Sequence, residues 1–222
     1  MTSIRTDADR ATAADRAQTF FDWTRINARL LTAGAVVVVI AAAGYWFYLR
    51  SRQIKAANAE KQLTTAKQSL SAGNASLAQS DLQKVVSRYG STSAGIEAAM
   101  TLAQMDYDAR KYQDGLTILQ KVSGSSAATM VEATIRSLEG DGYMQMGKPV
   151  EAAKQYDAAA EATSYETEKA FQRAKAARAY QEAGNVEKAK EIWTSLLNDP
   201  KSQTMASEAR VRLGELTAKP AK

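Results

Sequence analysis

The chain has 222 residues, with 29 Lys and Arg residues, 24 Asp and Glu residues and a formal net charge of +5. It contains no Cys and no His, which excludes disulfides, zinc fingers, thiol catalysis and most nucleophilic triads. The charged fraction of 24% argues against disorder, and the small numbers of Pro and Gly favour helices.

The positive charge is concentrated near the N-terminus. Residues 1–55 hold eight Arg and Lys residues against four Asp residues, which leaves 21 basic and 20 acidic residues in 56–222. A nearly neutral C-terminal region lacks the basic surface that nucleic-acid binding requires. We therefore expect no nucleic-acid partner, and the residue types suggest no cofactor, metal or small-molecule substrate.

The N-terminal tail, residues 1–29, combines a polar start with a short apolar stretch. Residues 1–18 are rich in Ala and alternate Arg with Asp, a pattern typical of disorder or of a weak helix. Apolar residues at helical spacing follow: Phe20, Phe21, Trp23 and Ile26. This spacing predicts an interfacial turn where the chain enters a bilayer.

Residues 30–49 form a run of twenty residues without a charge, bracketed by Arg29 and Arg50. At about 1.5 Å per residue, a helix of this length crosses the roughly 30 Å hydrocarbon core of a bilayer. Aromatic rings that prefer the membrane interface gather at its C-terminal end: Tyr45, Trp46 and Tyr48. We predict a transmembrane helix at 30–49. The alternative is a buried helix of a soluble domain, but such helices seldom lack a polar face over twenty residues.

Cleavage of this segment as a signal peptide is a second alternative, because Ala41, Ala42 and Ala43 resemble a small-residue cleavage site. However, twenty-nine residues precede the apolar run, and the hydrophobicity continues through Leu49. An uncleaved signal anchor fits better. The flanking charges leave the orientation open, because basic residues occur on both sides of the span.

A 37-residue period organises the chain after the span. No helix breaker occurs between Arg52 and Gly73, so we expect the membrane helix to continue into the first soluble helix. Four positions then recur 37 residues apart: Gly73, Arg110, Gly147 and Gly184. A fixed period in this range is typical of a solenoid of helical hairpins, in which Gly supplies the tight turn between helices.

Three further positions keep the same period. Small residues that allow close helix approach lie five positions after each turn: Ala78, Gly115, Ala152 and Ala189. Large residues follow four positions later: Leu82, Leu119, Tyr156 and Trp193. Apolar residues follow three positions after those: Val85, Val122, Ala159 and Leu196. We expect these side chains to pack within and between the hairpins.

The later repeats carry a family resemblance. One run resembles a tetratricopeptide repeat: Leu138, Gly140, Tyr143, Gly147, Ala152, Tyr156 and Ala159. A second run resembles it too: Ala177, Tyr180, Gly184, Ala189, Trp193, Leu196 and Pro200. The repeat before them departs from the pattern, with Asp106 in place of an aromatic residue and Arg110 in place of Gly. The resemblance implies an all-α chain, in which a single N-terminal transmembrane helix precedes a tetratricopeptide-like hairpin solenoid.

The expected boundaries follow from this period. We place the repeat domain at 50–222, with repeats near 59–91, 96–126, 133–163 and 170–200 and a C-terminal capping helix at 203–217. The period exceeds the usual 34 residues of the family, so we expect longer loops between repeats. Composition places these loops at Ser87–Gly95, Ser123–Ala128 and Thr163–Thr167.

A narrower resemblance covers the whole architecture. The Phe20-Phe21 pair, the aromatic-ended span and the degenerate repeats are similar to the YfgM-type ancillary Sec translocon subunit family. This resemblance implies a cytoplasmic N-terminus, a single span in the bacterial inner membrane and a repeat domain in the periplasm. It also implies association with the Sec translocon, with periplasmic chaperones or with unfolded clients.

A solenoid of this kind presents its first helices along a concave groove. Eight residues related by the 37-residue period are the expected protein-binding positions: Met100, Gln104, Tyr107, Ser137, Asp141, Met144, Arg178 and Gln181. Ala174 occupies the remaining equivalent position. Met and Tyr among polar residues suit adaptable binding of an apolar or extended peptide. Packing inside the repeats is an equal alternative for Met100 and Met144.

The function expected from these features is a membrane-anchored scaffold for protein–protein interaction. The scaffold associates with the Sec translocon and with periplasmic chaperones that handle translocated proteins, as the resemblance implies. A cytoplasm-facing or division-related adaptor is the alternative, favoured by the basic residues after Leu49. An enzyme is not expected, because no pattern of catalytic residues is present.

Overall fold

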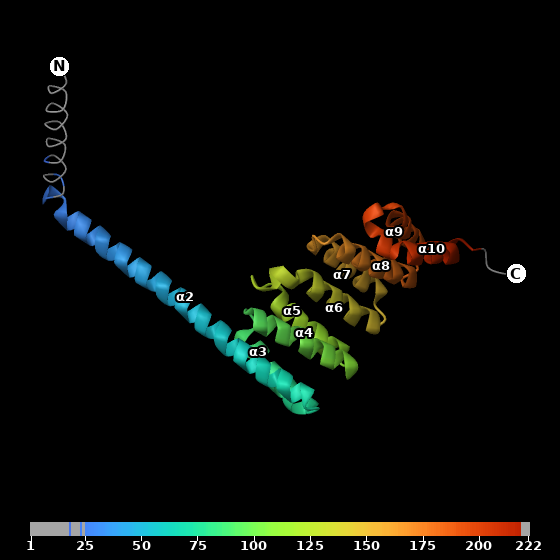
Figure 1. Cartoon of the computed structure of the whole chain (residues 1–222), viewed down its shortest axis with the longest axis horizontal. Coiled ribbons are helices and arrows are strands. Elements are labelled where there is room, and N and C mark those ends of the chain that lie inside the picture. Colours follow the sequence, from blue (N-terminus) through green and yellow to red (C-terminus); the bar gives the residue numbers. More distant parts are fainter. Residues whose placement is uncertain (1–17, 19–22, 24, 219–222) are drawn as a thin grey trace, which may run out of the picture. The chain divides into compact units, whose positions relative to one another are not determined.

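The computed structural model describes residues 18, 23 and 25–218 (Figure 1). Phe20 and Phe21 of the predicted interfacial turn lie outside the described residues. Across the described part of the chain the regular structure is helical and contains no strand, which confirms the all-α prediction. The helices are α2 (Ala28–Ser71), α3 (Ala75–Tyr89), α4 (Ser93–Asp108), α5 (Tyr112–Ser123), α6 (Glu132–Gln145), α7 (Pro149–Ala162), α8 (Glu166–Glu182), α9 (Val186–Asn198) and α10 (Gln203–Thr217). Two short 3-10 helices are η1 (Ala128–Val131) and η2 (Pro200–Ser202).

The chain divides into two units, one ending at Ile54 and one beginning at Lys55. In the first unit, the apolar part of α2 exposes its side chains. Val37 and Trp46 are 65% and 67% exposed, and no residue from 30 to 49 is buried. Within the described residues, α2 is the helix that is long and apolar enough to cross a membrane. The exposure of these side chains among the described residues does not support the alternative of a buried core helix.

Helix α2 continues without a break to Ser71, as the absence of breakers predicts. Its last residues pack in the repeat unit, where Ala59, Leu63 and Ala66 are fully buried. These residues share a core with Leu82 of α3 and with residues of α4, α5 and α6. The same continuous helix therefore supplies both the exposed apolar segment and the first helix of the solenoid.

The second unit is a series of helical hairpins closed by four similar turns. Gly73, Gly147 and Gly184 have φ angles of 77°, 66° and 80°, and Arg110 has a φ of 60°. In each turn this residue donates its N–H to the carbonyl three residues earlier, as Gly147 does to Met144 at 2.9 Å. The next residue donates to the carbonyl five residues earlier, which completes a Schellman motif. The predicted turn role of the 37-residue period is confirmed, with Arg110 as a non-glycine member.

Successive helices pair as α2–α3, α4–α5, α6–α7 and α8–α9, and α10 packs on α8 and α9 (Figure 1). The twelve periodic positions after the turns are all buried, as predicted: Ala78, Gly115, Ala152 and Ala189; Leu82, Leu119, Tyr156 and Trp193; Val85, Val122, Ala159 and Leu196. The core of α2–α6 is rich in Leu, Val and Ile, whereas that between α7 and α8 consists mostly of Ala. α10 covers Trp193 and Leu196 and is the predicted capping helix.

The first inter-repeat loop is shorter than predicted. α3 continues to Tyr89 and α4 begins at Ser93, so most of Ser87–Gly95 is helical. Thr92 caps α4, because its hydroxyl accepts the Gly95 N–H at 3.1 Å. A side chain at Gly95 would collide with the carbonyl of Tyr89, so this glycine allows close packing inside a helix. Composition predicted a loop here because Ser, Thr and Gly serve in caps as well as in loops.

Candidate protein-binding groove

The first helices of the hairpins carry the predicted binding positions. Between α4 and α6 lies a cavity of about 310 Å³, lined by Gln104, Tyr107, Asp108, Leu138, Asp141, Met144 and Gln145. We call this the first-helix cavity. Four of the eight predicted residues line it: Gln104, Tyr107, Asp141 and Met144. Their common position follows from the 37-residue period, which brings Gln104 and Asp141 to equivalent sites on neighbouring first helices.

Tyr107 is fixed within this cavity by close packing. Its hydroxyl donates to the Leu138 carbonyl oxygen at 3.1 Å. A Cβ added at Gly115 would lie 2.5 Å from the Tyr107 ring, and a side chain at Gly142 would collide with the hydroxyl. Burial raises the pKa of Tyr107 above its ordinary value, and the nearby Glu139 charge raises it further. Tyr107 therefore acts as a neutral hydrogen-bond donor with a fixed ring.

Asp141 belongs to a cluster that connects α6, α7 and α8. The Lys175 Nζ lies 2.6 Å from Asp141 Oδ1 and donates to Ser137 Oγ at 2.9 Å. It also lies 4.6 Å from the centre of the Tyr156 ring, whose hydroxyl donates to Asp141 at 2.6 Å. The sequence reasoning did not identify Lys175, although Lys175 follows the predicted position Ala174 directly. The cluster uses Ser137 and Asp141 to hold neighbouring hairpins together.

The remaining predicted residues lie outside the first-helix cavity. Arg178 forms two hydrogen bonds with Glu208 of α10, at 2.8 and 2.6 Å. Met100 is partly buried against the core, which favours its packing interpretation. Gln181 is partly buried near the end of α8 and lines none of the described cavities.

Ion pairs connect neighbouring first helices on either side of the cavity. Lys67 pairs with Glu97, and Arg178 pairs with Glu208, and in both pairs the acid lies thirty residues after the base. Gln104 occupies the position that is equivalent to the two bases. The residue thirty positions after Gln104 is a threonine, so no ion pair can form there. The first-helix cavity lies at this step, which lacks an ion pair of this kind.

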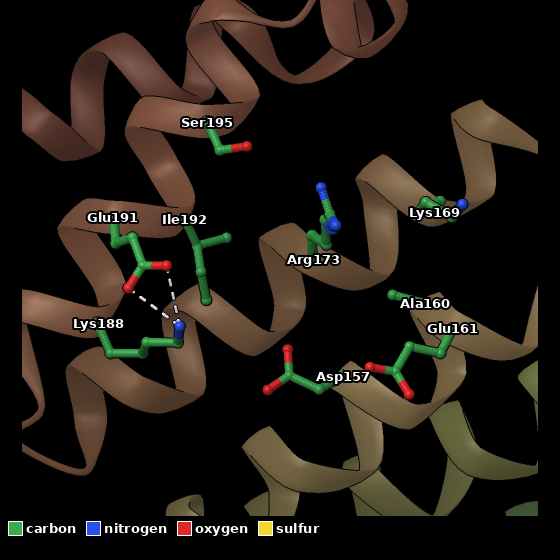
Figure 2. A pocket seen from close by; sticks show the side chains of 9 residues that line it. All are labelled: Asp157, Ala160, Glu161, Lys169, Arg173, Lys188, Glu191, Ile192 and Ser195. Atoms are coloured by element: carbon green, nitrogen blue, oxygen red, sulfur yellow. Dashed lines mark hydrogen bonds and ion pairs between the residues drawn. The ribbon is translucent and has the colours of Figure 1, made fainter.

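A second cavity of about 510 Å³ lies among α7, α8 and α9 and has a mixed charge (Figure 2). Figure 2 shows acidic side chains of α7 and α9 and basic side chains of α8 and α9 around one space. Lys188 contacts both carboxylate oxygens of Glu191 at 3.0 Å, and Tyr180 donates to Asp157 at 2.7 Å. Burial raises the pKa of Asp157. Because acids and bases are balanced here, this cavity does not select a ligand of one charge.

In the described part of the chain, no three His, Cys, Asp or Glu side chains are grouped so that they could hold a metal ion. The first-helix cavity offers amide, carboxylate, phenol and apolar groups, which can bind a peptide through hydrogen bonds and contacts.

The comparisons with known proteins agree with the hairpin architecture. A family profile described as "Tetratricopeptide repeat-like domain" matches residues 22–137 and 59–175. No curated protein sequence matches the chain significantly. Among solved structures, a Podospora anserina protein described as "kinesin light chain nearly identical TPR-like repeats" is similar, with a TM-score of 0.52 and 17% identity over 70% of this chain and 87% of that chain. The pilF protein of Pseudomonas aeruginosa gives a TM-score of 0.51 and 13% identity over 72% of this chain and 76% of that chain.

Proposed function

The chain belongs to the tetratricopeptide repeat-like domain family, and from this membership we propose that it is a membrane-anchored scaffold that binds other proteins. The observation that carries the anchoring is the exposed apolar part of α2. The observation that carries binding is the first-helix cavity, which brings together residues of two neighbouring repeats. Tetratricopeptide domains generally bind other proteins, and this cavity is suited to such a role.

The proposed arrangement divides the chain at the membrane. Residues 1–29 form a cytoplasmic tail, 30–49 span the bacterial inner membrane, and 50–222 form a periplasmic repeat domain. Arg52 lies 5.8 Å from the centre of the Tyr48 ring, a contact that suits the interfacial end of a span. The resemblance to the YfgM-type family supports the Sec translocon and periplasmic chaperones or their clients as partners.

The proposed binding surface comprises the eight predicted residues, with the first-helix cavity at its centre. Gln104 is exposed, and Tyr107, Asp141 and Met144 are partly exposed. Ser137, Arg178 and Met100 support this surface from neighbouring positions. The proposed activity is binding alone, because the cavity contains no nucleophile paired with a base.

The alternative function is a cytoplasm-facing or division-related adaptor. Arg50, Arg52 and Lys55 directly follow the span, and basic residues beside a span favour the cytoplasmic side. The two functions differ in the side of the membrane on which the repeats lie.

The absence of native cysteine permits a direct test of topology. Two single-cysteine variants are made, Ser3→Cys in the tail and Gln113→Cys on α5, and spheroplasts are treated with a membrane-impermeant maleimide. The proposed orientation predicts labelling of the Gln113 variant in intact spheroplasts, and of the Ser3 variant after lysis alone. The reverse pattern would establish the cytoplasm-facing alternative.

The binding surface is tested by site-specific photo-crosslinking in native membranes. A photoreactive amino acid is placed at Gln104 in the first-helix cavity and, as a matched control, at exposed Gln113 on α5. We expect a defined adduct from position 104 that is weak or absent at position 113. Equal adducts from both positions would contradict binding at the first-helix cavity.

A further inference from the structure

Position 106 carries an aspartate where the later hairpins have a tyrosine. Residues 37 and 74 positions after Asp106 are Tyr143 and Tyr180. Each tyrosine reaches the second helix of the preceding hairpin: Tyr143 accepts from Gln120 at 3.4 Å, and Tyr180 donates to Asp157 at 2.7 Å. Gln120 and Asp157 are themselves 37 residues apart. An aromatic ring at this position therefore spans two hairpins.

Asp106 instead accepts a hydrogen bond from Gln79 of α3, and both residues line a cavity. The residue equivalent to Gln120 and Asp157 is Gln83, and it lines a cavity of about 560 Å³ together with Asp106. We call this the Asp106 cavity. It lies among α3, α4 and α5, and its other lining groups include Gln79, Asp114 and the Thr117 hydroxyl.

The floor of the Asp106 cavity carries a buried negative charge. Asp106 is only 4% exposed, and its Oδ1 accepts a hydrogen bond from Gln79 Nε2 at 3.0 Å. None of the ion pairs found among the described residues includes Asp106 or Asp114. The Lys111 side chain also lines the cavity but is exposed and forms no ion pair there. A carboxylate taken out of water without an ion-pair partner is unfavourable, so the cavity favours a cation.

The electrostatic environment of Asp106 agrees with this geometry. Burial raises the pKa of Asp106, and the neighbouring Asp114 charge raises it further. Lys111 and the Gln79 hydrogen bond act in the opposite direction, and the net effect is still upward. A bound cation would stabilise the charged form of Asp106 and so lower its pKa.

We propose that the Asp106 cavity binds the guanidinium group of an arginine presented by a partner protein, with Asp106 as its counter-ion. A guanidinium carries five N–H donors in a planar fork, whereas an ammonium is a compact point charge. The cavity offers acceptors in several directions: the two carboxylates, the Gln83 amide oxygen and the Thr117 hydroxyl. The Asp106 cavity is separate from the first-helix cavity, so the inference does not rest on binding there.

The test uses three short peptides and the full chain in detergent micelles, with glutamine side chains labelled with nitrogen-15. The peptides are N-acetyl-Gly-Arg-Gly-amide, the same peptide with citrulline as the neutral isostere of arginine, and the same peptide with lysine. We expect the arginine peptide to shift the side-chain amide signal of Gln79 saturably and with the highest affinity. Absence of a shift, or an equal response to citrulline or lysine, would overturn the proposal.

Two variants locate the binding. Asp106→Asn keeps the side-chain shape and removes the charge, so we expect the affinity for the arginine peptide to fall about tenfold or more. Asp157→Asn removes a carboxylate of the α7–α9 cavity, and we expect it to leave the affinity unchanged. Unaltered binding by Asp106→Asn would contradict the proposal. The peptide comparison on the unmodified chain decides the question even where a variant fails to fold, which circular dichroism reports.

Discussion

Arg110 has a backbone conformation that glycine adopts at the three equivalent turn positions. Its φ of 60° lies in the left-handed region, where an L-residue with a Cβ is disfavoured by about 1–2 kcal/mol. Its side chain is exposed, so the turn gains no burial from it. The strain is maintained by the same pair of backbone hydrogen bonds that closes the three glycine turns.

Replacing Arg110 with Gly is expected to stabilise the repeat unit. The relieved strain exceeds the extra chain entropy of glycine, and we expect a net gain of about 1 kcal/mol in the free energy of unfolding. Thermal unfolding of the full chain in detergent, followed by circular dichroism, measures the change. The control is Gly147→Ala, which introduces the same strain and should destabilise by a similar amount. A lower stability of Arg110→Gly would contradict the assignment of strain.

Glu139 is a second residue that departs from its counterparts. The residues 37 positions before and after it are Leu102 and Ala176, and all three are buried. Glu139 Oε2 accepts from Arg136 at 3.3 Å, while Oε1 has no hydrogen-bond partner. Burial raises the pKa of Glu139 above its ordinary 4.5, and Arg136 only partly offsets this.

This shift predicts how stability depends on pH. Because the folded pKa exceeds the unfolded one, the folded state binds the proton more tightly, and stability falls as pH rises from 4.5 to the raised value. At pH values above the raised pKa, the free energy of unfolding stays at this lower level. We expect the Glu139→Gln variant to lack this decrease in unfolding free energy with rising pH. Unfolding curves recorded over a pH series measure it. Parallel pH profiles for the two proteins would show that Glu139 does not titrate in this way.

At the scale of the elements, the packing interface among α6, α7 and α8 (the α8 joint) depends on polar contacts. Its apolar core consists mostly of Ala, which buries little surface for each side chain. Lys175 compensates by contacting Asp141, Ser137 and the Tyr156 ring from one partly buried position, with 15% of its side chain exposed. The joint between the second and third hairpins, in contrast, has larger apolar residues.

Lys175→Met is therefore expected to weaken this joint. The loss of charge-assisted hydrogen bonds at a mostly buried site should cost about 1.5–3 kcal/mol of unfolding free energy. The matched control is Lys67→Met, which removes an ion pair that is 48% exposed on the lysine side and should cost at most about 1 kcal/mol. Thermal unfolding of both variants makes the comparison. Equal effects would mean that the Lys175 contacts contribute no more than a surface pair.

For the whole repeat unit, α10 closes the final hairpin. It contributes Met205, Ala209 and Leu213 to the cluster around Trp193, which is completely buried. Terminal repeats need such a helix because their last apolar face has no further hairpin to pack on.

A chain that stops after Ser202 is expected to expose Trp193 to water. The emission of Trp193, measured with Trp23 and Trp46 replaced by Phe, should shift to longer wavelength, and the thermal midpoint should fall. A chain that ends at Thr217 keeps α10 and should behave like the full chain. An unchanged Trp193 emission without α10 would show that another segment covers the last hairpin.

The sequence period was sufficient to predict the hairpins, their turns and the buried positions, because each depends on spacing within one repeat. It also identified four residues that line the first-helix cavity, because the same period places Gln104 and Asp141 on neighbouring helices. Lys175 was missed because its role depends on contacts with residues of another hairpin, which spacing within one repeat does not reveal. The Asp106 cavity was missed for a related reason: the departure from the aromatic pattern was visible, but the cavity is formed by residues of three helices.

The shared turn geometry has an evolutionary consequence. Each hairpin turns at the same backbone hydrogen-bonded corner, so a gene segment of 37 codons that runs from one corner to the next can be duplicated or deleted with both junctions kept intact. Individual hairpins also contain residues that the others lack, such as the buried Glu139. The array can therefore change length by whole units, but one hairpin cannot replace another without changing its contacts.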